Sequence, residues 1–420
     1  GGIIRALTPS SNGLEKRPKL RFPGFDEPWE HKELLHYLVE NTDRNKQLKF
    51  GKENVLSVSG EYGIVNQIAF QGRSFAGESV ADYHVVETDD IVYTKSPLKA
   101  KPYGIIKVNN GVPGIVSTLY AVYHPLKTVV PRFVDFYFSN DLRLNKFLKP
   151  LVNIGAKHDM KVNNTFVLTG MVVFPPLREQ QKIVDFLTIL DRRIDVQRKK
   201  VEALKKYKRG VFETVFSQKV RLIPRNKRKD WQKYKLSDFA TRVTRKNGGQ
   251  SDIPLTISAQ YGLIDQRDFF SKTVASADMS GYYLLRSGEY AYNRSTSNDY
   301  PFGSIKRLEL YPMGAVSTLY LCFRVKDDIV LSDLAKWYFE SSQWHRGVNE
   351  ICAEGARNHG LLNVPTDGFF NTVHTLPSDP EEQLAIASYL SLFQARLDSA
   401  QAVLEKLLRI RSGLMQRLFT

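Results

Sequence analysis

The segment "GIVSTLY" at residues 114–120 returns as "GAVSTLY" at residues 314–320. One short match can arise by chance, but further segments repeat in the same order, about 200 positions apart. They are "YGIVNQ" (62–67) and "YGLIDQ" (261–266), "PYGIIK" (102–107) and "PFGSIK" (301–306), and Gly155-Ala156-Lys157 and Gly355-Ala356-Arg357. A period of about 20–50 residues would indicate a solenoid, whereas about 200 residues is the size of a domain. The sequence therefore predicts an internal duplication.

Each copy ends in a long segment of a different kind, at residues 178–217 and 381–420. Neither segment contains proline, and apolar side chains recur alternately three and four positions apart, which is the pattern of a coiled coil. The seam positions are Ile183, Leu187, Leu190, Ile194, Val201 and Leu204 in the first segment, and Ile386, Leu390, Phe393, Leu397, Leu404 and Leu407 in the second.

One such helix alone would expose a long apolar stripe to water. Two stripes in one chain predict that the helices pair as a coiled coil. The alternative is that each helix packs only on its own domain, but the seam runs the whole length of both segments and favours pairing. Lys208 and Arg411 occupy matching seam positions, where they would fix the register or mark an opening to a partner.

The bodies of the two copies, residues 26–175 and 225–378, contain short β-branched and aromatic runs separated by glycines and polar residues. Such runs are typical of strands and turns. "VDFYFSNDLRLNKFL" (134–148) and "LSDLAKWYFESSQWHRGV" (331–348) predict one helix in each copy. Each body is therefore predicted to be a mixed α/β globule.

The formal net charge is +16, which suggests a polyanionic partner, although charge alone fits a merely soluble basic protein equally well. The cysteines, Cys322 and Cys352, form no CxxC pair, which suits a reducing cytoplasm and argues against a cysteine-based metal site. No apolar run is long enough for a transmembrane helix. We therefore expect a cytoplasmic protein without a membrane partner. Residues 1–19 are expected to be an N-terminal tail or an expression remnant.

Motifs of catalysis are missing from the sequence. There is no G-x-x-x-x-G-K-[ST] phosphate loop, and the histidines lack the spacing of metal ligands. The Pro-Pro pair in "FPPL" (174–177) lacks the residues that adenine-modifying methyltransferases need before and after it. We predict no catalytic residue and no metal or cofactor bound by this chain.

Positive and polar side chains are expected on loops at matching places in both copies, directly after predicted strands or after the Gly-Ala pairs. Such side chains supply the donors used on phosphates and base edges. For any one residue an ordinary solvated loop is equally compatible, but the match between copies favours DNA binding. The candidates are Lys95, Ser96, Lys157, His158, Arg294, Ser295, Arg357, Asn358 and His359.

A variable α/β body followed by a long helix, twice over, resembles the specificity subunit of type I restriction–modification systems. The resemblance covers the chain from about Leu20 and is most specific in "LRFPGF" (20–25) with Trp29, in the Gly-Ala-Lys/Arg segments, and in "FPPLREQQKIVDFLTILDRRID" (174–195). The second copy departs from the pattern, with "LPSDPEEQLAI" (376–386) where "PPLREQ" is usual. We interpret this departure as drift within the helix cap.

The resemblance implies an α+β fold of two tandem mixed α/β target recognition domains, separated by two long helices that pair as an antiparallel coiled coil with pseudo-twofold symmetry. The implied boundaries are 20–175 for the first recognition domain, 176–222 for a central helical spacer, 223–378 for the second recognition domain, and 379–420 for a C-terminal helical spacer.

The resemblance also implies a protein that is not an enzyme. Each recognition domain reads one half of a bipartite target in double-stranded DNA, and the duplication matches the dyad of the duplex. The helical pair sets the spacing and docks two DNA adenine methyltransferase subunits, and restriction/translocase subunits join them. S-adenosylmethionine, ATP and Mg belong to those partners. A self-contained DNA methyltransferase or nuclease, and a coiled-coil assembly adaptor without a DNA role, remain as alternatives; the +16 charge argues against the adaptor.

Overall fold

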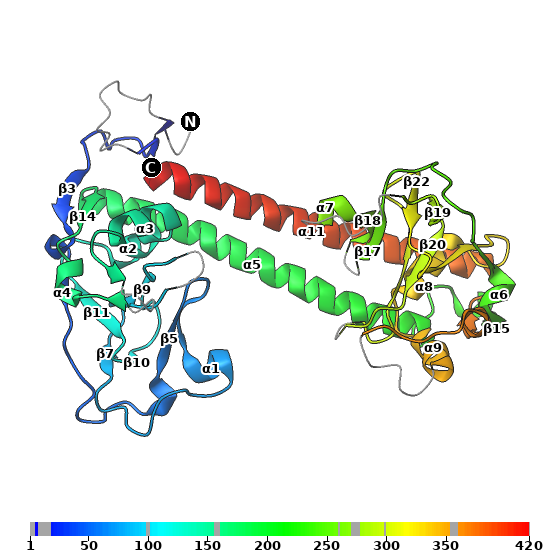
Figure 1. The fold of residues 1–420 in the computed structure, drawn as a ribbon, viewed down its shortest axis with the longest axis horizontal. Helices are drawn as coiled ribbons and strands as arrows, with labels where there is room; N and C mark the ends of the chain where they lie inside the picture. The colour runs from blue at the N-terminus through cyan, green and yellow to red at the C-terminus, as the bar shows by residue number, and fades with distance from the viewer. Residues whose placement is uncertain are drawn as a thin grey trace. The chain divides into compact units, whose positions relative to one another are not determined.

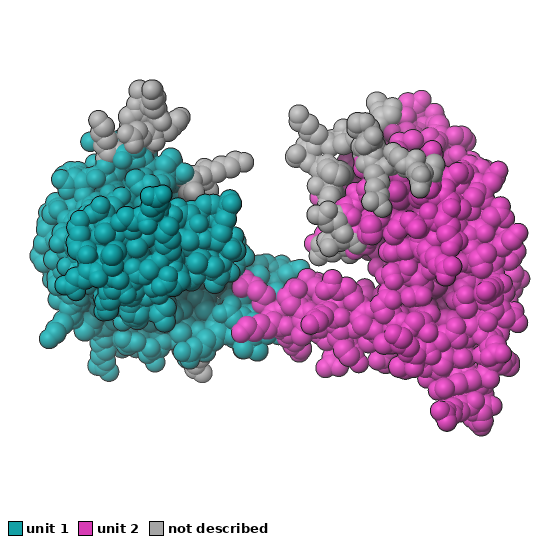
Figure 2. Space-filling view, turned by 90° about the horizontal axis from the view of Figure 1, so that it is seen from below, with its two compact units in different colours: residues 1–197, 403–420 teal, residues 198–402 magenta. Residues whose placement is uncertain are grey.

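The computed structural model describes residues 5–6, 18–97, 101–154, 160–258, 261–269, 278–297, 300–352 and 360–419. The chain divides into two compact units, unit 1 (1–197 and 403–420) and unit 2 (198–402). Each unit contains one α/β body and a part of both long helices (Figures 1 and 2). Among the described residues, no helix is long and apolar enough to cross a membrane.

The body of unit 1 is built on a four-stranded antiparallel sheet in the order β4 (Leu38–Glu40), β11 (Tyr120–Pro125), β8 (Ile91–Thr94), β9 (Ile106–Val108). Two-stranded pairs surround it: β7 (His84–Val86) with β10 (Gly114–Val116), β5 (Leu56–Ser59) with β6 (Gly63–Asn66), β3 (Glu30–Glu33) with β14 (Met171–Phe174), β12 (Asn153–Ile154) with β13 (Met160–Lys161), and β1 (Arg5–Ala6) with β2 (Leu20–Arg21). The helices of this body are α1 (Gln67–Gln71), α2 (Pro131–Phe138), α3 (Asp141–Leu148) and α4 (Asn164–Val167), with 3-10 turns at Leu34–His36 and Lys52–Asn54.

The body of unit 2 repeats this arrangement. Its four-stranded sheet has the order β16 (Ala240–Arg242), β23 (Leu321–Val325), β20 (Tyr290–Asn293), β21 (Ser304–Arg307). The strand pairs are β19 (Tyr283–Arg286) with β22 (Met313–Val316), β17 (Leu255–Ser258) with β18 (Gly262–Asp265), and β15 (Gln232–Lys235) with β24 (Val373–Leu376). The helices are α6 (Leu236–Phe239), α7 (Gln266–Phe269), α8 (Ser332–Phe339), α9 (His345–Ile351) and α10 (Thr366–Phe370), with a 3-10 turn at Arg225–Lys227. The matching strand orders confirm the duplication predicted from the repeats.

One repeated glycine explains why "PYGIIK" and "PFGSIK" are so similar. Gly104 and Gly303 have φ of +87° and +77°, a conformation that only glycine adopts readily. A Cβ on Gly104 would lie 1.9 Å from the carbonyl oxygen of Thr94, and one on Gly303 would lie 2.1 Å from that of Asn293. Any side chain would therefore push this turn away from the central sheet of its body.

The prediction of one helix per body after the sheet is wrong in both copies. The segment 134–148 is divided between α2 and α3, and the segment 331–348 between α8 and α9. In the first break, the side chain of Asn140 accepts a hydrogen bond from the backbone N–H of Arg143 (3.1 Å) and starts α3. This N-terminal cap begins a new helix three residues before Arg143, so the segment forms two helices instead of one. In the N-terminal segment, Arg5–Ala6 pairs with Leu20–Arg21.

The two long helices are α5 (Leu177–Phe216) and α11 (Pro380–Phe419), of 40 residues each. Within unit 1, Arg411 of α11 donates to Asp191 of α5 (Nε–Oδ1 2.5 Å). Within unit 2, the rings of Tyr207 and Phe393 lie 5.5 Å apart. The residue number on α11 falls as that on α5 rises, so the helices are antiparallel in each unit, as predicted (Figure 1).

The burial of the seam residues varies along the helices. Buried seam residues are Ile183, Leu187, Ile194, Val201, Ile386, Leu390, Leu397 and Leu407, and half-buried ones are Leu190, Leu204, Phe393 and Leu404. The helix ends also pack on the bodies, since the ring of Phe419 lies 5.7 Å from that of Phe133. Both packing modes considered from the sequence therefore occur together. Lys208 faces the body of unit 2, with its Nζ 5.1 Å and 5.7 Å from the rings of Phe212 and Trp337.

The start of each long helix is fixed to its body by a Glu-Gln pair. In unit 1, buried Arg21 donates two hydrogen bonds to buried Glu179 (2.8 and 2.7 Å). Gln180 accepts from the N–H of Val130 (2.9 Å) and donates to the carbonyl of Pro175 (2.9 Å).

Unit 2 repeats these contacts with Arg221, Glu382 and Gln383. Arg221 donates to both carboxylate oxygens of Glu382, and Gln383 accepts from the N–H of Leu331 (2.7 Å). The departure of the second copy from "PPLREQ" therefore leaves its Glu-Gln pair in place.

Candidate nucleic-acid interface

Strand register brings several loops of unit 1 to one end of its body. Thr94 at the end of β8 pairs with Tyr120, so Lys95 lies beside the β10–β11 turn at Leu119. Residue Val55, just before β5, bridges Ile115 of β10 in the parallel direction, so the β5–β6 hairpin points toward the same end. Gly60 at the hairpin tip lies close to Lys101, which precedes β9.

The same loops meet in unit 2. Arg294 follows β20 and donates from Nη2 to the carbonyl of Leu319 in the β22–β23 turn (3.0 Å). The parallel bridge between Pro254 and Ala315 orients the β17–β18 hairpin toward this end. Register alone therefore gives both bodies an equivalent polar end, which we call the loop end.

The described candidates lie at the loop end of their body. Lys95, Ser96, Arg294 and Ser295 all follow a central strand, and both serines are exposed. The other candidates, Lys157, His158, Arg357, Asn358 and His359, lie outside the described residues. In unit 2, Thr296 donates to the carbonyl of Gly360 (2.7 Å) and Ser295 bridges Leu361. Gly360 and Leu361, which follow residues 353–359 in the chain, therefore lie at the loop end of unit 2.

Lys95 belongs to a polar network and is half-buried. Its Nζ donates to Oδ1 of Asn164 (3.2 Å), and the amide of Asn164 donates to Glu40 (2.9 Å). Burial lowers the pKa of Lys95, the carboxylate of Glu40 opposes this, and the charge of Arg44 adds to it. The charge of Lys95 is therefore held in place close to a second cation, which is the arrangement that attracts phosphate.

The side chain of Arg294 is held in place by hydrogen bonds within the body of unit 2. Besides Leu319, it binds the carbonyl of Val364 through Nη1 (3.4 Å). Both terminal guanidinium nitrogens therefore hold loop backbone, and Arg294 supplies positive charge at the loop end while its fork is occupied. This position differs from a free side chain that reads base edges.

Sequence reasoning missed a second pair of matched basic loops. Buried Asn45 caps its loop by accepting from the N–H of Phe50 (3.1 Å), and buried Asn247 caps the equivalent loop through Ser251 (2.9 Å). Each asparagine follows an exposed cation, Arg44 or Lys246. The sequence contains a basic tripeptide with asparagine in each copy, "RNK" (44–46) and "RKN" (245–247). The asparagine is the second residue of the first tripeptide and the third residue of the other, so the two tripeptides do not align letter by letter.

His84 lies under this basic loop without adding charge to it. It is 2% exposed, and burial followed by the charges of Arg44 and Lys95 lowers its pKa to about 4. The imidazole is therefore neutral near pH 7. Arg44 bridges His84, which pairs with Val116 next to the β10–β11 turn, so Arg44 also lies at the loop end of unit 1.

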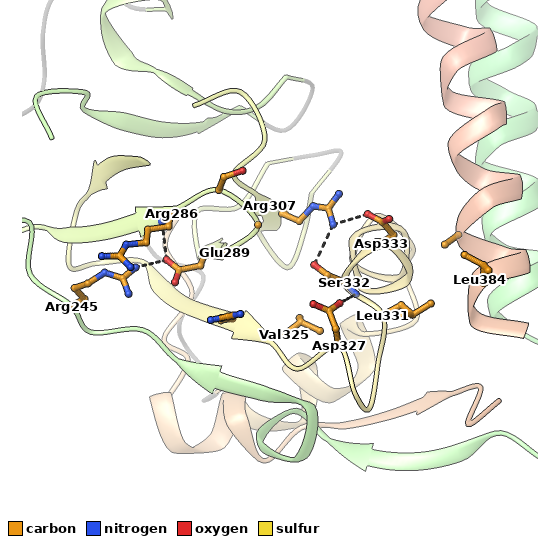
Figure 3. A pocket seen from close by; sticks show the side chains of 14 residues that line it. Arg245, Arg286, Glu289, Arg307, Val325, Asp327, Leu331, Ser332, Asp333 and Leu384 are labelled. Atoms are coloured by element: carbon orange, nitrogen blue, oxygen red, sulfur yellow. Dashed lines mark hydrogen bonds and ion pairs between the residues drawn. The ribbon is translucent and has the colours of Figure 1, made fainter. Parts of the chain in front are cut away.

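Unit 2 also contains a pocket of about 620 Å³ at the opposite end of β20 (Figure 3). Arg245, Arg286, Arg307 and Arg324 line it together with acidic residues. Arg245 pairs with Glu289 (2.7 Å) and Arg307 with Asp333 (2.8 Å), so much of this charge is neutralised internally.

Strand register aligns the four arginines of this pocket with residues of unit 1 that are not arginines. The aligned residues are Asp43, Glu87, Val108 and His124. The pocket is therefore specific to the second copy and is not a part of the matched loop ends.

The described residues hold no cluster of three or more His, Cys, Asp or Glu side chains suited to a metal ion. Cys322 is buried, and Cys352 is partly buried.

The chain contains two related α/β bodies with matched loop ends, each followed by a long helix, and comparison with known proteins finds the same fold. Over 96% of this chain and 99% of the other, the structure is similar to the S subunit of a type I restriction–modification system from M. genitalium (TM-score 0.56, 12% identity). It is also similar to a chain from a study of complex assembly and conformational transition in the type I R-M system, over 93% and 97% of the two chains (TM-score 0.52, 14% identity).

Residues 77–206 match the family described as the type I restriction modification DNA specificity domain. This segment contains the central strands β8, β9 and β11, Lys95, and the first half of α5. The match of this segment agrees with the family resemblance seen in the sequence.

Proposed function

We infer that this chain is the DNA sequence-recognition subunit of a type I restriction–modification system. The observation that carries the inference is the family match of residues 77–206, which includes Lys95 and the β10–β11 turn at the loop end of unit 1. The net charge of +16 and the matched cations on both bodies support a DNA partner. The alternatives of a self-contained enzyme and a pure adaptor are not favoured by this match.

Each body would read one half of a bipartite target. The two bodies share their strand order, but their loops carry different residues at matching positions, such as Lys95 and Arg294. Different side chains on one framework would let each body recognise a different short sequence. The helices α5 and α11 would set the number of base pairs between the two halves. The domain boundaries expected from the sequence are part of this proposal.

The outer faces of the long helices would dock two copies of one partner. Ile189 of α5 and Leu392 of α11 occupy equivalent positions of the duplication and are 66% and 73% exposed. Matched apolar positions on two related helices suit two identical subunits. We propose that these are DNA adenine methyltransferase subunits, which carry S-adenosylmethionine, and that restriction/translocase subunits carry ATP and Mg. A chain that works on DNA with free cysteines fits the cytoplasm.

The test is an exchange of residues 26–175 for the equivalent body of a relative, followed by mapping of methylated adenines in host DNA. One half of the recognition sequence should change, while the other half and the spacer length stay, because unit 2 and the helices are untouched. A chain carrying an exchange of residues 225–378 is the matched control and should change the opposite half. A change in both halves after a single exchange would contradict independent reading.

A further inference from the structure

Four exposed side chains are retained between the two copies although they contribute little to either core. Tyr62 and Tyr261 are 60% and 61% exposed, and Leu119 and Leu319 are 65% and 58% exposed. Tyr62 touches the ring of Phe70 (5.3 Å), which is itself 46% exposed. Buried residues are retained because packing demands them, but packing gives no such reason for an exposed ring or leucine. Their retention in two bodies whose loops have diverged points to a shared contact.

The turns that carry these side chains are held in the same way in both copies. The N–H of Tyr62 donates to Oγ of Ser59 (3.2 Å), and the N–H of Tyr261 donates to Oγ of Ser258 (3.2 Å). The glycine after each tyrosine has a positive φ, +75° at Gly63 and +81° at Gly262. The duplication has therefore preserved both the side chain and the turn that presents it.

The leucines are presented by a second preserved turn. The N–H of Leu119 donates to Oγ of Ser117 (3.4 Å), and that of Leu319 to Oγ of Ser317 (3.3 Å). These turns belong to the repeated "VSTLY" segments at 116–120 and 316–320.

Both sets of side chains lie at the loop end of their body. Leu119 precedes Tyr120, which pairs with Thr94 next to Lys95, and Leu319 accepts from Arg294 through its carbonyl. The parallel bridges of β10 and β22 orient the tyrosine hairpins toward this end. Each loop end thus combines a cation with an exposed aromatic ring and an exposed aliphatic side chain, which together suit the charged phosphates and the apolar sugar rings of duplex DNA.

We propose that Tyr62 and Tyr261, each with its neighbouring Leu119 or Leu319, bind DNA through features that every sequence shares, namely the deoxyribose rings and phosphates of the backbone. This proposal rests on the proposed function. Two bodies that read different half-sites need different residues at base edges, whereas residues kept in both bodies fit what the half-sites have in common. The tyrosines therefore supply affinity and hold the duplex in place, and the variable loops discriminate.

The test compares Tyr62→Ala and Tyr261→Ala with wild-type full-length chain, assembled with its partner subunits. Fluorescence anisotropy measures the Kd for the target duplex and for duplexes in which one half-site is scrambled. Each alanine variant is expected to bind every duplex about 10-fold more weakly, with the ratio between target and scrambled duplexes unchanged, because a backbone contact is lost on all sequences alike. Tyr62→Phe should retain most of the affinity, because the ring face makes the contact.

Matched controls are Phe75→Ala in unit 1 and Leu310→Ala in unit 2, which remove side chains of similar exposure (58% and 63%). Leu310 aligns with Gly111, so it is not retained. Both controls should bind like wild type.

Two results would overturn the proposal: alanine variants that bind as tightly as wild type, or variants that lose discrimination at one half-site only. Wild-type complex that binds no duplex would instead refute the proposed function itself.

Discussion

Replacing Glu382 by glutamine should destabilise unit 2 far more than replacing its neighbour Glu381. The side chain of Glu382 is 1% exposed, and both of its oxygens bind the guanidinium of Arg221, which is 11% exposed. Nε1 of Trp231 also donates to Glu382 (3.1 Å). Glu381 pairs with Lys227, but these side chains are 58% and 52% exposed.

The expected difference follows from solvation. An amide at position 382 leaves the charge of Arg221 buried without a counter-charge, and removing one partner of a buried pair costs about 3–5 kcal/mol. An exposed pair is screened by water and contributes about 0–1 kcal/mol, so Glu381→Gln is the matched control. Replacing both partners of the buried pair with methionine should recover most of the loss, because apolar side chains need no counter-charge.

Urea denaturation of the full-length chain, followed by tryptophan fluorescence, measures the effect. Trp231, Trp337 and Trp344 lie in unit 2, whereas Trp29 lies in unit 1, so the signal reports mainly on unit 2. With a slope of about 3 kcal/mol per molar urea, Glu382→Gln should lower the midpoint by about 1 M or more. Equal midpoints for Glu382→Gln and Glu381→Gln would refute the reasoning that burial decides the value of these pairs.

Two further predictions concern the helix seam and a buried histidine. Replacing Leu204 and Leu407 together by aspartate puts carboxylates into the seam, where burial of an unpaired charge is costly. Methylation of the split target should be lost, while circular dichroism should show that the bodies remain folded. Normal methylation by the double variant would rule out the helix-pair spacer. His374 is 2% exposed, and burial lowers its pKa to about 4. The unfolded chain binds this proton near pH 6.5 and the folded chain does not, so unit 2 should lose up to about 3 kcal/mol of stability as the pH falls from about 6.5 to about 4. His374→Gln should make the midpoint less dependent on pH in that range, and an unchanged pH profile would argue against a neutral buried imidazole.

The sequence by itself determined the duplication and the two long helices. A repeated segment is recognised by comparing residues along the chain, so its detection does not depend on the fold. A heptad seam is likewise a local pattern, because any helix of this sequence places the seam residues on one face. The segments "PYGIIK" and "PFGSIK" were recognised as a repeat from letters alone, and the contacts of Gly104 and Gly303 supply the steric reason. Short polar residues inside predicted helices, such as Asn140, were a weaker local signal and were overlooked.

Only the tertiary structure decided which charged residues are structural and which face outward. Arg21 and Glu179 stand 158 positions apart, so no local pattern shows that they share a buried ion pair. The sequence predicts Arg294 as a DNA contact, yet its guanidinium donates hydrogen bonds to two backbone carbonyls from distant segments. The loop ends likewise emerge from strand register, which depends on how remote strands pair. Helical periodicity is a property of residues close together in the sequence. The environment of a charged side chain depends on residues distant in the sequence that the fold places next to it.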